Sequence, residues 1–280
     1  MFKLFPLAAT GTLLLAGVCH AQLYDPTYYT IDVNNDVLCS ITVPGGVVTP
    51  LGPLGIDVDA VDLGWHQGAL YMKTWGTSAG NKICQVVTEG HWLGAALQGQ
   101  FLTGGGYQTG AEASGIASDG IQLHITYSDG SPTVQYSRLF GQINTIWAGV
   151  ITADTVASPI PDDLDSLGFA GTQFYAIDVR GPSTGTGWDL YVGSYAGSTV
   201  TWARIPGGTY DVSSNPVDIE DYSVNDLIAV CQDGLHIRTV NRSNAAAGAP
   251  IAVTGLLPNG KLEGIAKKPA PCPRRIIWIP

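Results

Sequence analysis

Residues 166–177 read SLGFAGTQFYAI, and this short stretch carries the pattern that decides the fold. A glycine-centred apolar segment is followed by a tight turn and then by a second apolar segment with bulky side chains. Short apolar runs that are broken by Gly, Asn, Asp or Ser are typical of β-strands joined as hairpins. Such runs fill most of the chain, and helical periodicity is almost absent. The sequence therefore predicts an all-β protein.

The same pattern recurs along the chain at a nearly constant interval. Further copies are DLGWHQGALYM at 62–72, SGIASDGIQLHI at 114–125, NDLIAVCQDGLHI at 225–237 and LEGIAKK at 262–268. The central glycines Gly64, Gly115 and Gly168 are spaced by 51 and 53 residues. A repeating unit of about 50 residues, built from short strands, is typical of a four-stranded propeller blade. We therefore expect a single β-propeller.

The glycine at the centre of each copy has a packing reason. The innermost strands of the blades crowd around a common axis, where a bulky side chain has no room. The following strand lies farther out and carries large residues such as Tyr71 and Phe174. A small residue on the first strand and bulky residues on the second are therefore expected in every blade.

The number of blades follows from dividing the chain at these copies. The final copy has an inner strand with little after it, and the N-terminal region has outer strands with no inner strand before them. Joining the two completes one blade and protects the edge strands of the ring. Five blades are expected, which comprise residues 56–108, 109–158, 159–213, 214–258, and a composite of 259–268 with 23–55. Six smaller blades are the alternative.

The repeated motif resembles that of bacterial secreted β-propeller repeat proteins. The resemblance rests on the glycine-centred pattern and on the Tyr-x-Ile-Asp-Val sequences at 29–33 and 175–179. It covers most of residues 23–268 and implies the propeller fold. That superfamily has many unrelated functions, so the resemblance implies no catalytic residue.

The two ends of the chain differ in composition from the propeller. Residues 1–21 combine Lys3, an apolar stretch from Leu4 to Val18 and a small residue at Ala21, which predicts a signal peptide. The apolar stretch is shorter than the ~20 residues that span a bilayer. We therefore expect no transmembrane segment, a propeller domain over 22–268 and a Pro-rich basic tail over 269–280. The product is expected to be secreted, periplasmic or held at the cell surface.

Composition narrows the range of functions. The chain has 23 acidic and 13 basic residues and a net charge of −10, which opposes nucleic-acid binding. The cysteines that follow the signal peptide are Cys39, Cys84, Cys231 and Cys272. In an oxidising compartment four cysteines allow three pairings, and a buried free thiol is an equal alternative for Cys39 and Cys84.

Acidic residues gather in the segments that lead into the expected inner strands, which predicts a negative channel mouth. Three interpretations remain open. Carboxylates that converge could hold Ca²⁺, two carboxylates across a groove could hydrolyse a glycoside, or the aspartates could simply form turns. The candidate metal ligands are Asp57, Asp59, Asp162, Asp163, Asp218 and Asp221. The candidate catalytic residues are Asp59, Asp62, Asp163 and Asp221.

Two tryptophans flank loops that are rich in Gly, Ser and Thr. Trp75 and Trp188 are therefore the candidates for an exposed aromatic pair that binds a ligand. Taken together, the sequence predicts an exported, monomeric, non-catalytic binding propeller with an acidic and calcium-binding channel mouth. Its partner would be a glycan, a peptide or a cell-surface component, and a glycoside hydrolase is the alternative.

Overall fold

The computed structural model describes twelve parts of the chain: residues 28–76, 80–88, 94–101, 113–127, 139–143, 149–151, 153–155, 164–178, 187–196, 199–208, 211 and 214–269. Within these parts all regular elements are β-strands, and none is a helix. The expected all-β class is confirmed.

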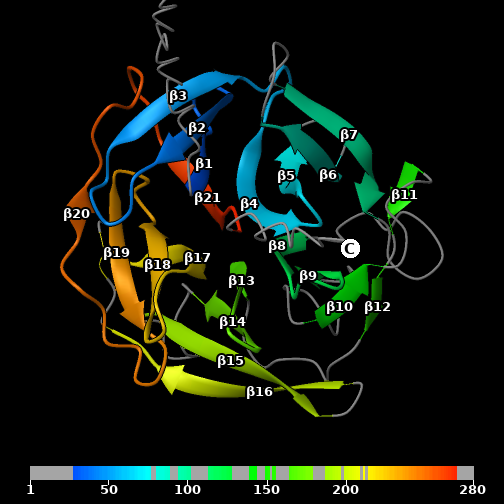
Figure 1. Ribbon diagram of the computed structural model, residues 1–280, viewed down its shortest axis with the longest axis vertical. Helices are drawn as coiled ribbons and strands as arrows, with labels where there is room; N and C mark the ends of the chain where they lie inside the picture. Colours follow the sequence, from blue (N-terminus) through cyan, green and yellow to red (C-terminus); the bar gives the residue numbers. More distant parts are fainter. Residues whose placement is uncertain are drawn as a thin grey trace, which may run out of the picture.

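The strands form five sheets that stand around a common axis (Figure 1). The composite sheet contains strands from both ends of the described chain: β21 (Leu262–Lys267), β1 (Tyr28–Asp32), β2 (Val37–Ile41) and β3 (Val48–Pro53). The second sheet contains β4 (Asp59–His66), β5 (Ala69–Gly76), β6 (Gly80–Val87), β7 (Gly94–Phe101) and β11 (Gly149–Ile151). The third contains β8 (Ala113–Ser118), β9 (Leu123–Tyr127), β10 (Leu139–Ile143) and β12 (Ala153–Thr155).

The remaining two sheets follow the same plan. The fourth contains β13 (Ser166–Ala170), β14 (Gln173–Asp178), β15 (Asp189–Ala196) and β16 (Thr199–Pro206). The fifth contains β17 (Pro216–Asp221), β18 (Asp226–Cys231), β19 (His236–Asn241) and β20 (Ile251–Ala252). In Figure 1 the strands β21, β4, β8, β13 and β17 lie nearest the axis, and we call them the inner strands. This radial arrangement is a β-propeller, as expected.

The composite sheet joins segments that are far apart in the sequence. Strand β1 pairs antiparallel with β21, from Tyr28 opposite Lys267 to Asp32 opposite Leu262. The next strand, β2, pairs antiparallel with β1 along its whole length. The inner position of this sheet is therefore filled by the last strand of the described chain and the outer positions by the first three.

One segment departs from the expected blade boundaries. Residues 149–151 were expected in the blade of residues 109–158, but β11 pairs parallel with β7 of the preceding sheet. Strand β12 follows after a single residue and pairs antiparallel with β10 of its own sheet. An outermost strand leaves one row of backbone groups unpaired, and β11 satisfies part of that row on β7.

The glycines of the inner strands lie where the expected packing requires them. A Cβ atom on Gly115 would lie 2.5 Å from the Leu167 nitrogen, and one on Gly168 would lie 2.7 Å from the Ile219 oxygen. A Cβ on Gly64 would lie 3.1 Å from the Ile116 oxygen, and one on Gly264 would lie 2.9 Å from the Leu63 side chain. Each glycine thus faces the next inner strand at a distance that excludes a larger side chain.

The prediction of the inner strand is wrong for the fourth copy of the repeat. The sequence at 225–237 was expected to hold an inner strand, but it forms β18, a turn and β19. The inner strand of this sheet is β17, in which Asp218-Ile219-Glu220 stands where β4 has Asp62-Leu63-Gly64. The error arose because Glu220 replaces the glycine that marks the other copies.

The apolar cores between sheets contain three of the four cysteines that follow residue 21 as free thiols. Cys39, Cys84 and Cys231 are fully buried and unpaired. Burial raises the pKa of the Cys84 thiol to about 11 and the pKa values of Cys39 and Cys231 to about 12. These three residues act as small hydrophobes, whereas Cys272 lies outside the described residues.

Candidate ligand site at the C-terminal ends of the inner strands

Asp62 connects three inner strands through its carboxyl group. One oxygen, Oδ2, accepts hydrogen bonds from the backbone N–H groups of Ile116 at 2.8 Å and Leu167 at 3.2 Å. The other, Oδ1, accepts the N–H of Leu63 at 2.9 Å. Because these donors belong to β8, β13 and β4, the fully buried Asp62 side chain ties three sheets together at the axis.

Two further carboxyl groups continue this connection around the ring. Asp218 on β17 accepts the N–H of Gly264 on β21 at 2.9 Å. Glu263 on β21 accepts the N–H of Val61 on β4 at 3.1 Å and the ammonium of Lys261 at 2.6 Å. We call Asp62, Asp218 and Glu263 the axial carboxyl network.

Burial controls the protonation of this network. Burial raises the pKa of Asp62 well above its usual range, and the charge of Asp218 raises it further. Burial also raises the pKa of Asp218, to about 7, and the nearby Glu263 adds to the shift. The hydrogen bond from Gly264 and the charge of Lys73 act in the opposite direction. Asp62 and Asp218 therefore hold their protons at a higher pH than ordinary aspartates do.

The expectation that Asp62 and Asp218 line an open channel mouth is wrong. Asp62 is 0% exposed and Asp218 is 5% exposed, because both carboxyl groups accept backbone N–H groups of neighbouring inner strands. Asp57 and Asp59, by contrast, are exposed. Asp162 and Asp163 lie outside the described residues. In the part of the chain that is described, no group of three or more His, Cys, Asp or Glu side chains is placed to hold a metal ion.

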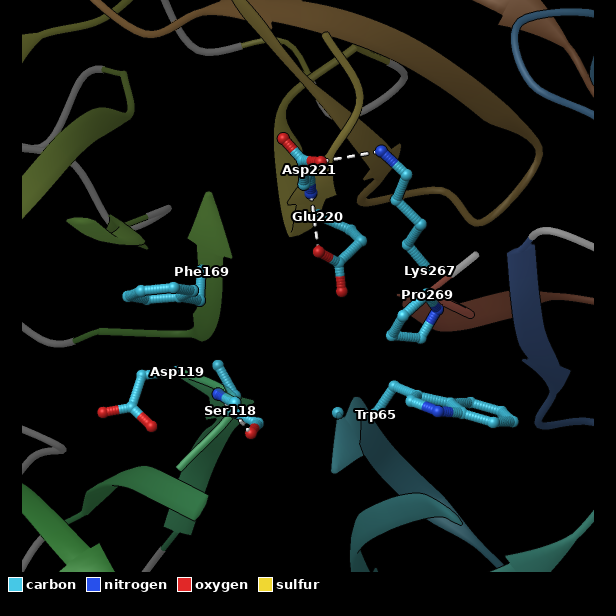
Figure 2. Close-up of a pocket in the computed structure, with 11 residues that line it drawn as sticks. Trp65, Ser118, Asp119, Phe169, Glu220, Asp221, Lys267 and Pro269 are labelled. Carbon is cyan, nitrogen blue, oxygen red and sulfur yellow. Dashed lines mark hydrogen bonds and ion pairs between the residues drawn. The ribbon is translucent and has the colours of Figure 1, made fainter. Parts of the chain in front are cut away.

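A pocket of about 320 Å³ lies at the C-terminal ends of the inner strands, and we call it the exit pocket. All five inner strands contribute residues at or near their C-terminal ends, which shows that these ends converge. Figure 2 shows the arrangement of its main side chains. Its lining residues are Gly64, Trp65, Ala117, Ser118, Asp119, Gly120, Phe169, Glu220, Asp221, Lys267 and Pro269.

Glu220 reaches the pocket because it occupies the glycine position of the repeat. Its Oε1 atom accepts the backbone N–H of Asp221 at 2.6 Å. In Figure 2 its carboxyl group points toward the space between Phe169 and Pro269. Burial raises the pKa of Glu220 to about 8, despite the opposing hydrogen bonds from the backbone of Asp221 and Lys267. At pH 7 the carboxyl group of Glu220 is therefore mostly neutral.

Asp221 is held in an ion-pair network beside Glu220. One of its oxygens pairs with the Lys267 ammonium at 2.7 Å, and the other pairs with the Arg242 guanidinium. The Tyr28 hydroxyl donates to the Asp221 carbonyl oxygen at 2.8 Å. These contacts fix the wall of the pocket between β17 and the composite sheet.

The opposite wall is formed by the turn that follows β8. Asp119 accepts the backbone N–H groups of Ile121 at 2.8 Å and Gln122 at 2.7 Å, and the Tyr195 hydroxyl at 2.7 Å. Burial alone would raise the pKa of Asp119, but these hydrogen bonds outweigh it and hold the pKa below its usual value. The adjacent Ser118 hydroxyl lies 2.8 Å from Nδ1 of His66.

The aromatic walls of the pocket are packed against the blades. The Trp65 ring stacks on Tyr29 at 5.6 Å, and the Lys268 ammonium lies 5.8 Å from its centre. The Phe169 ring contacts the Phe174 ring at 4.9 Å. In Figure 2 the two rings extend in opposite directions, away from the space between them. They therefore give rigid apolar walls rather than free stacking surfaces.

The expectation that Trp188 is exposed is wrong. Its side chain is 2% exposed and packs over Gly207, where a Cβ atom would lie 2.7 Å from the indole. It lines a separate pocket of about 380 Å³ together with Arg238, whose guanidinium donates twice to the Gly248 carbonyl. The side chain of Trp75 lies outside the described part of the chain, although its backbone pairs with Asp59.

Of the residues singled out from the sequence, Asp221 lines the exit pocket. Sequence reasoning missed Trp65, Ser118, Asp119, Glu220 and Lys267. One sequence signal could have identified Glu220, which stands at the glycine position of the repeat. A glutamate at that position places a long acidic side chain beside the axis. The acidic segments that precede the inner strands instead predicted a site at the N-terminal ends of these strands.

No protein-family model matches the chain, and no curated protein matches it. Among solved structures it is similar to the glutaminyl cyclase of Myxococcus xanthus, with a TM-score of 0.51 and 12% identity over 88% of this chain and 90% of that chain. It is also similar to a chain of the nidogen/laminin complex, with a TM-score of 0.50 and 11% identity over 86% of this chain and 80% of that chain. At these identities the likeness shows the fold alone. The expected superfamily-level resemblance to β-propeller proteins is confirmed.

Among the described residues, no helix is long and apolar enough to cross a membrane.

Proposed function

We propose that this protein is a binding protein and that its ligand occupies the exit pocket. The observation that carries the proposal is the convergence of all five inner strands on one pocket of about 320 Å³. Small-molecule sites typically measure ~300–1,000 Å³ and combine apolar walls with a few fixed polar groups. The exit pocket has this composition, since Phe169 and Ala117 lie beside Ser118 and Glu220. The ligand would be a glycan residue, a peptide side chain or part of a cell-surface component.

We also propose that the binding protein is a closed, monomeric five-bladed ring whose composite blade joins the two ends of the chain. The pairing of β1 with β21 supports this proposal. The approach of Gly264 to Leu63 and the hydrogen bond from Val61 to Glu263 place β21 directly beside β4. Rigid walls that several blades hold in place favour a preformed pocket, because little ordering is then needed on binding.

The alternative of a glycoside hydrolase receives less support. Its candidate carboxylates differ in environment: Asp59 is exposed at the start of β4, Asp62 is buried among backbone donors, and Asp221 is engaged in ion pairs at the end of β17. Paired catalytic carboxylates must face each other across one groove, at separations of ~5–10 Å. A binding role therefore explains the arrangement better.

Export and calcium binding are proposed from the sequence. An exported protein would begin at Gln22 after removal of residues 1–21, and mass spectrometry of the mature N-terminus measures this directly.

A calcium site would involve Asp57 and Asp59 with Asp162 and Asp163. Calcium would then raise the melting temperature and EDTA would reverse the rise, because a ligand of the folded state stabilises it.

The binding proposal is tested by closing the pocket. Pro269 lines the exit pocket, so P269W should fill its opening. The matched control is P206W, since Pro206 is exposed on the outer strand β16. Both variants and the wild-type protein are screened against a glycan array and a panel of synthetic peptides. The proposal expects a ligand that the wild-type protein and P206W bind and P269W does not, whereas equal binding by P269W would overturn it.

A further inference from the structure

Two exposed apolar side chains lie in turns whose neighbouring residues line the exit pocket. Ile121 is 76% exposed and Val224 is 87% exposed, and both values exceed those of the other large exposed hydrophobics in the described residues. Ile121 lies in the turn between β8 and β9, directly after Asp119 and Gly120 of the pocket lining. Val224 lies in the turn between β17 and β18, three residues after Asp221. The pocket is therefore flanked by an apolar side chain from each of two non-adjacent sheets.

Both turns hold these side chains outward. In the first turn, Asp119 accepts the backbone N–H groups of Ile121 and Gln122. In the second turn, the Ser223 hydroxyl accepts the N–H groups of Asn225 at 3.3 Å and Asp226 at 3.1 Å. Local hydrogen bonds of this kind fix a turn. Ile121 and Val224 are thus presented to solvent in a fixed position.

We propose that the exit pocket and the turns carrying Ile121 and Val224 form a docking surface for an extended polypeptide. The partner places a Lys or Arg side chain in the pocket and rests apolar side chains on Ile121 and Val224. This inference rests on the proposed function and names the partner of the same site.

Charge complementarity supports a cationic side chain. Three carboxyl groups line the pocket, on Asp119, Glu220 and Asp221, against the single ammonium of Lys267. Lys267 and Arg242 pair with Asp221, and Lys268 lies over Trp65. Asp119 and Glu220 accept hydrogen bonds from backbone N–H groups and, for Asp119, the Tyr195 hydroxyl, so a cationic ligand would meet these two carboxyl groups. The chain as a whole carries −10, which attracts a basic segment from a distance.

The aromatic side chains argue for a polypeptide over a glycan. Sugar binding commonly uses an open aromatic face, but Trp65 is covered by Tyr29 and Lys268, and Phe169 packs on Phe174. The exposed rim instead offers aliphatic side chains, which match Leu, Ile or Val of a peptide. A strand-like or extended segment can direct alternate side chains to such separate points.

Binding of a cation requires Glu220 to release its proton. Burial raises the pKa of Glu220 to about 8, and its charged neighbours are Asp221, Lys267 and Arg242, with Asp119 across the pocket. A bound ammonium favours the ionised carboxylate. Affinity should therefore rise with pH below about 8, by up to about tenfold per pH unit, with release of a proton.

The experiment selects random 12-residue peptides displayed on phage against the wild-type protein and removes those that also bind the double variant I121D/V224D. The control is L235D, because Leu235 is 47% exposed but lies in the turn between β18 and β19, at the opposite end of the fifth sheet. Selected sequences should contain Lys or Arg beside apolar residues. Calorimetry should show unchanged affinity for L235D and at least a tenfold loss for I121D/V224D.

A selected peptide is then compared with the same peptide acetylated at its lysine, and the wild-type protein with E220Q. Acetylation should abolish binding, and E220Q should weaken binding and remove its rise between pH 6 and pH 8. Failure to select any rim-dependent peptide, or equal binding of the acetylated peptide, would overturn the inference. If a glycan still binds and P269W blocks it, the proposed function stands while this inference fails. If P269W blocks no ligand, both fail.

Discussion

The two ends of the inner strands use acidic side chains in different ways. Toward the N-terminal ends of the inner strands, the oxygens of Asp62 and Asp218 accept backbone N–H groups of neighbouring inner strands. At the C-terminal ends, Glu220 and Asp119 line a pocket. Glu220 accepts backbone N–H groups of Asp221 and of Lys267 on β21, and Asp119 accepts two N–H groups of its own turn and the Tyr195 hydroxyl. The two pairs differ in access, since Asp62 and Asp218 are buried among backbone donors and Glu220 and Asp119 line a pocket. An acidic side chain beside the axis is structural where the inner strands close around it and is available to a ligand where they leave a pocket.

The largest effect is expected from removing the strand that completes the composite sheet. Deletion of 259–280 removes β21, whose Leu262, Ile265 and Ala266 are fully buried. It also removes the donor for Asp218 and the acceptor for Val61. We expect loss of cooperative unfolding and aggregation, measured by calorimetry and light scattering. Deletion of 270–280 alone is the control and should leave the transition in place, while an unchanged transition in the larger deletion would sink the closed ring.

A smaller but still large effect is expected at Asp62. D62A leaves three backbone N–H groups, those of Leu63, Ile116 and Leu167, without their acceptor. An unsatisfied buried donor costs ~1–3 kcal/mol, so the free energy of unfolding should fall by about 3 kcal/mol or more. D221N removes the shared partner of two partly exposed ion pairs, with Lys267 and with Arg242, each typically worth ~0–1 kcal/mol. Urea denaturation compares the two variants, and equal losses would contradict the distinction between the two ends.

A further loss of stability is expected when a glycine of the closely packed inner strands is replaced. G168V would place side-chain atoms within about 3 Å of the Ile219 backbone, because a Cβ there already lies 2.7 Å from its oxygen. Overpacking of this kind typically lowers stability by ~1–3 kcal/mol. T172V in the exposed turn after β13 is the control and should change little. A stable G168V protein would show that the inner strands can move apart.

Stability should also depend on pH. Asp218 has a folded pKa of about 7 and Glu220 of about 8, both above their usual values near 4, because burial favours the neutral forms. Their contribution is complete below about pH 4 and is lost as pH rises through 7 to 8, by roughly 1 kcal/mol per pH unit for each titrating group. D218N should flatten the decline up to pH 7, and E220Q should flatten it up to pH 8. Urea titrations from pH 4 to pH 9 measure the slope, and stability that rises over this range would refute the assignment.

Much of the fold followed from local patterns. The glycines at 64, 115, 168 and 264 identified four inner strands, because crowding at an axis leaves the same mark in each copy. The fifth inner strand escaped recognition because Glu220 stands at the marked position. The transfer of β11 to the sheet of β7 was also invisible, since a three-residue edge strand carries no period of its own.

The candidate site was less accessible from the sequence. The acidic segments predicted an open mouth at the N-terminal ends of the inner strands, and Trp188 was expected at the surface. Neither prediction could anticipate which atoms face each side chain. Trp188 is covered because Gly207 leaves space for its ring, and Asp62 is covered because three inner strands meet around it.

The sequence by itself determined an all-β repeat architecture, the crowded axis and the net negative charge, because these depend on local periodicity and composition. The tertiary structure decided what each carboxyl group does. The donors that hold Asp62 lie 54 and 105 residues away along the chain, and the neighbours of Glu220 come from a strand that completes the composite sheet. Protonation and ligand access depend on such distant neighbours, because they set the hydrogen bonds and the burial of each group.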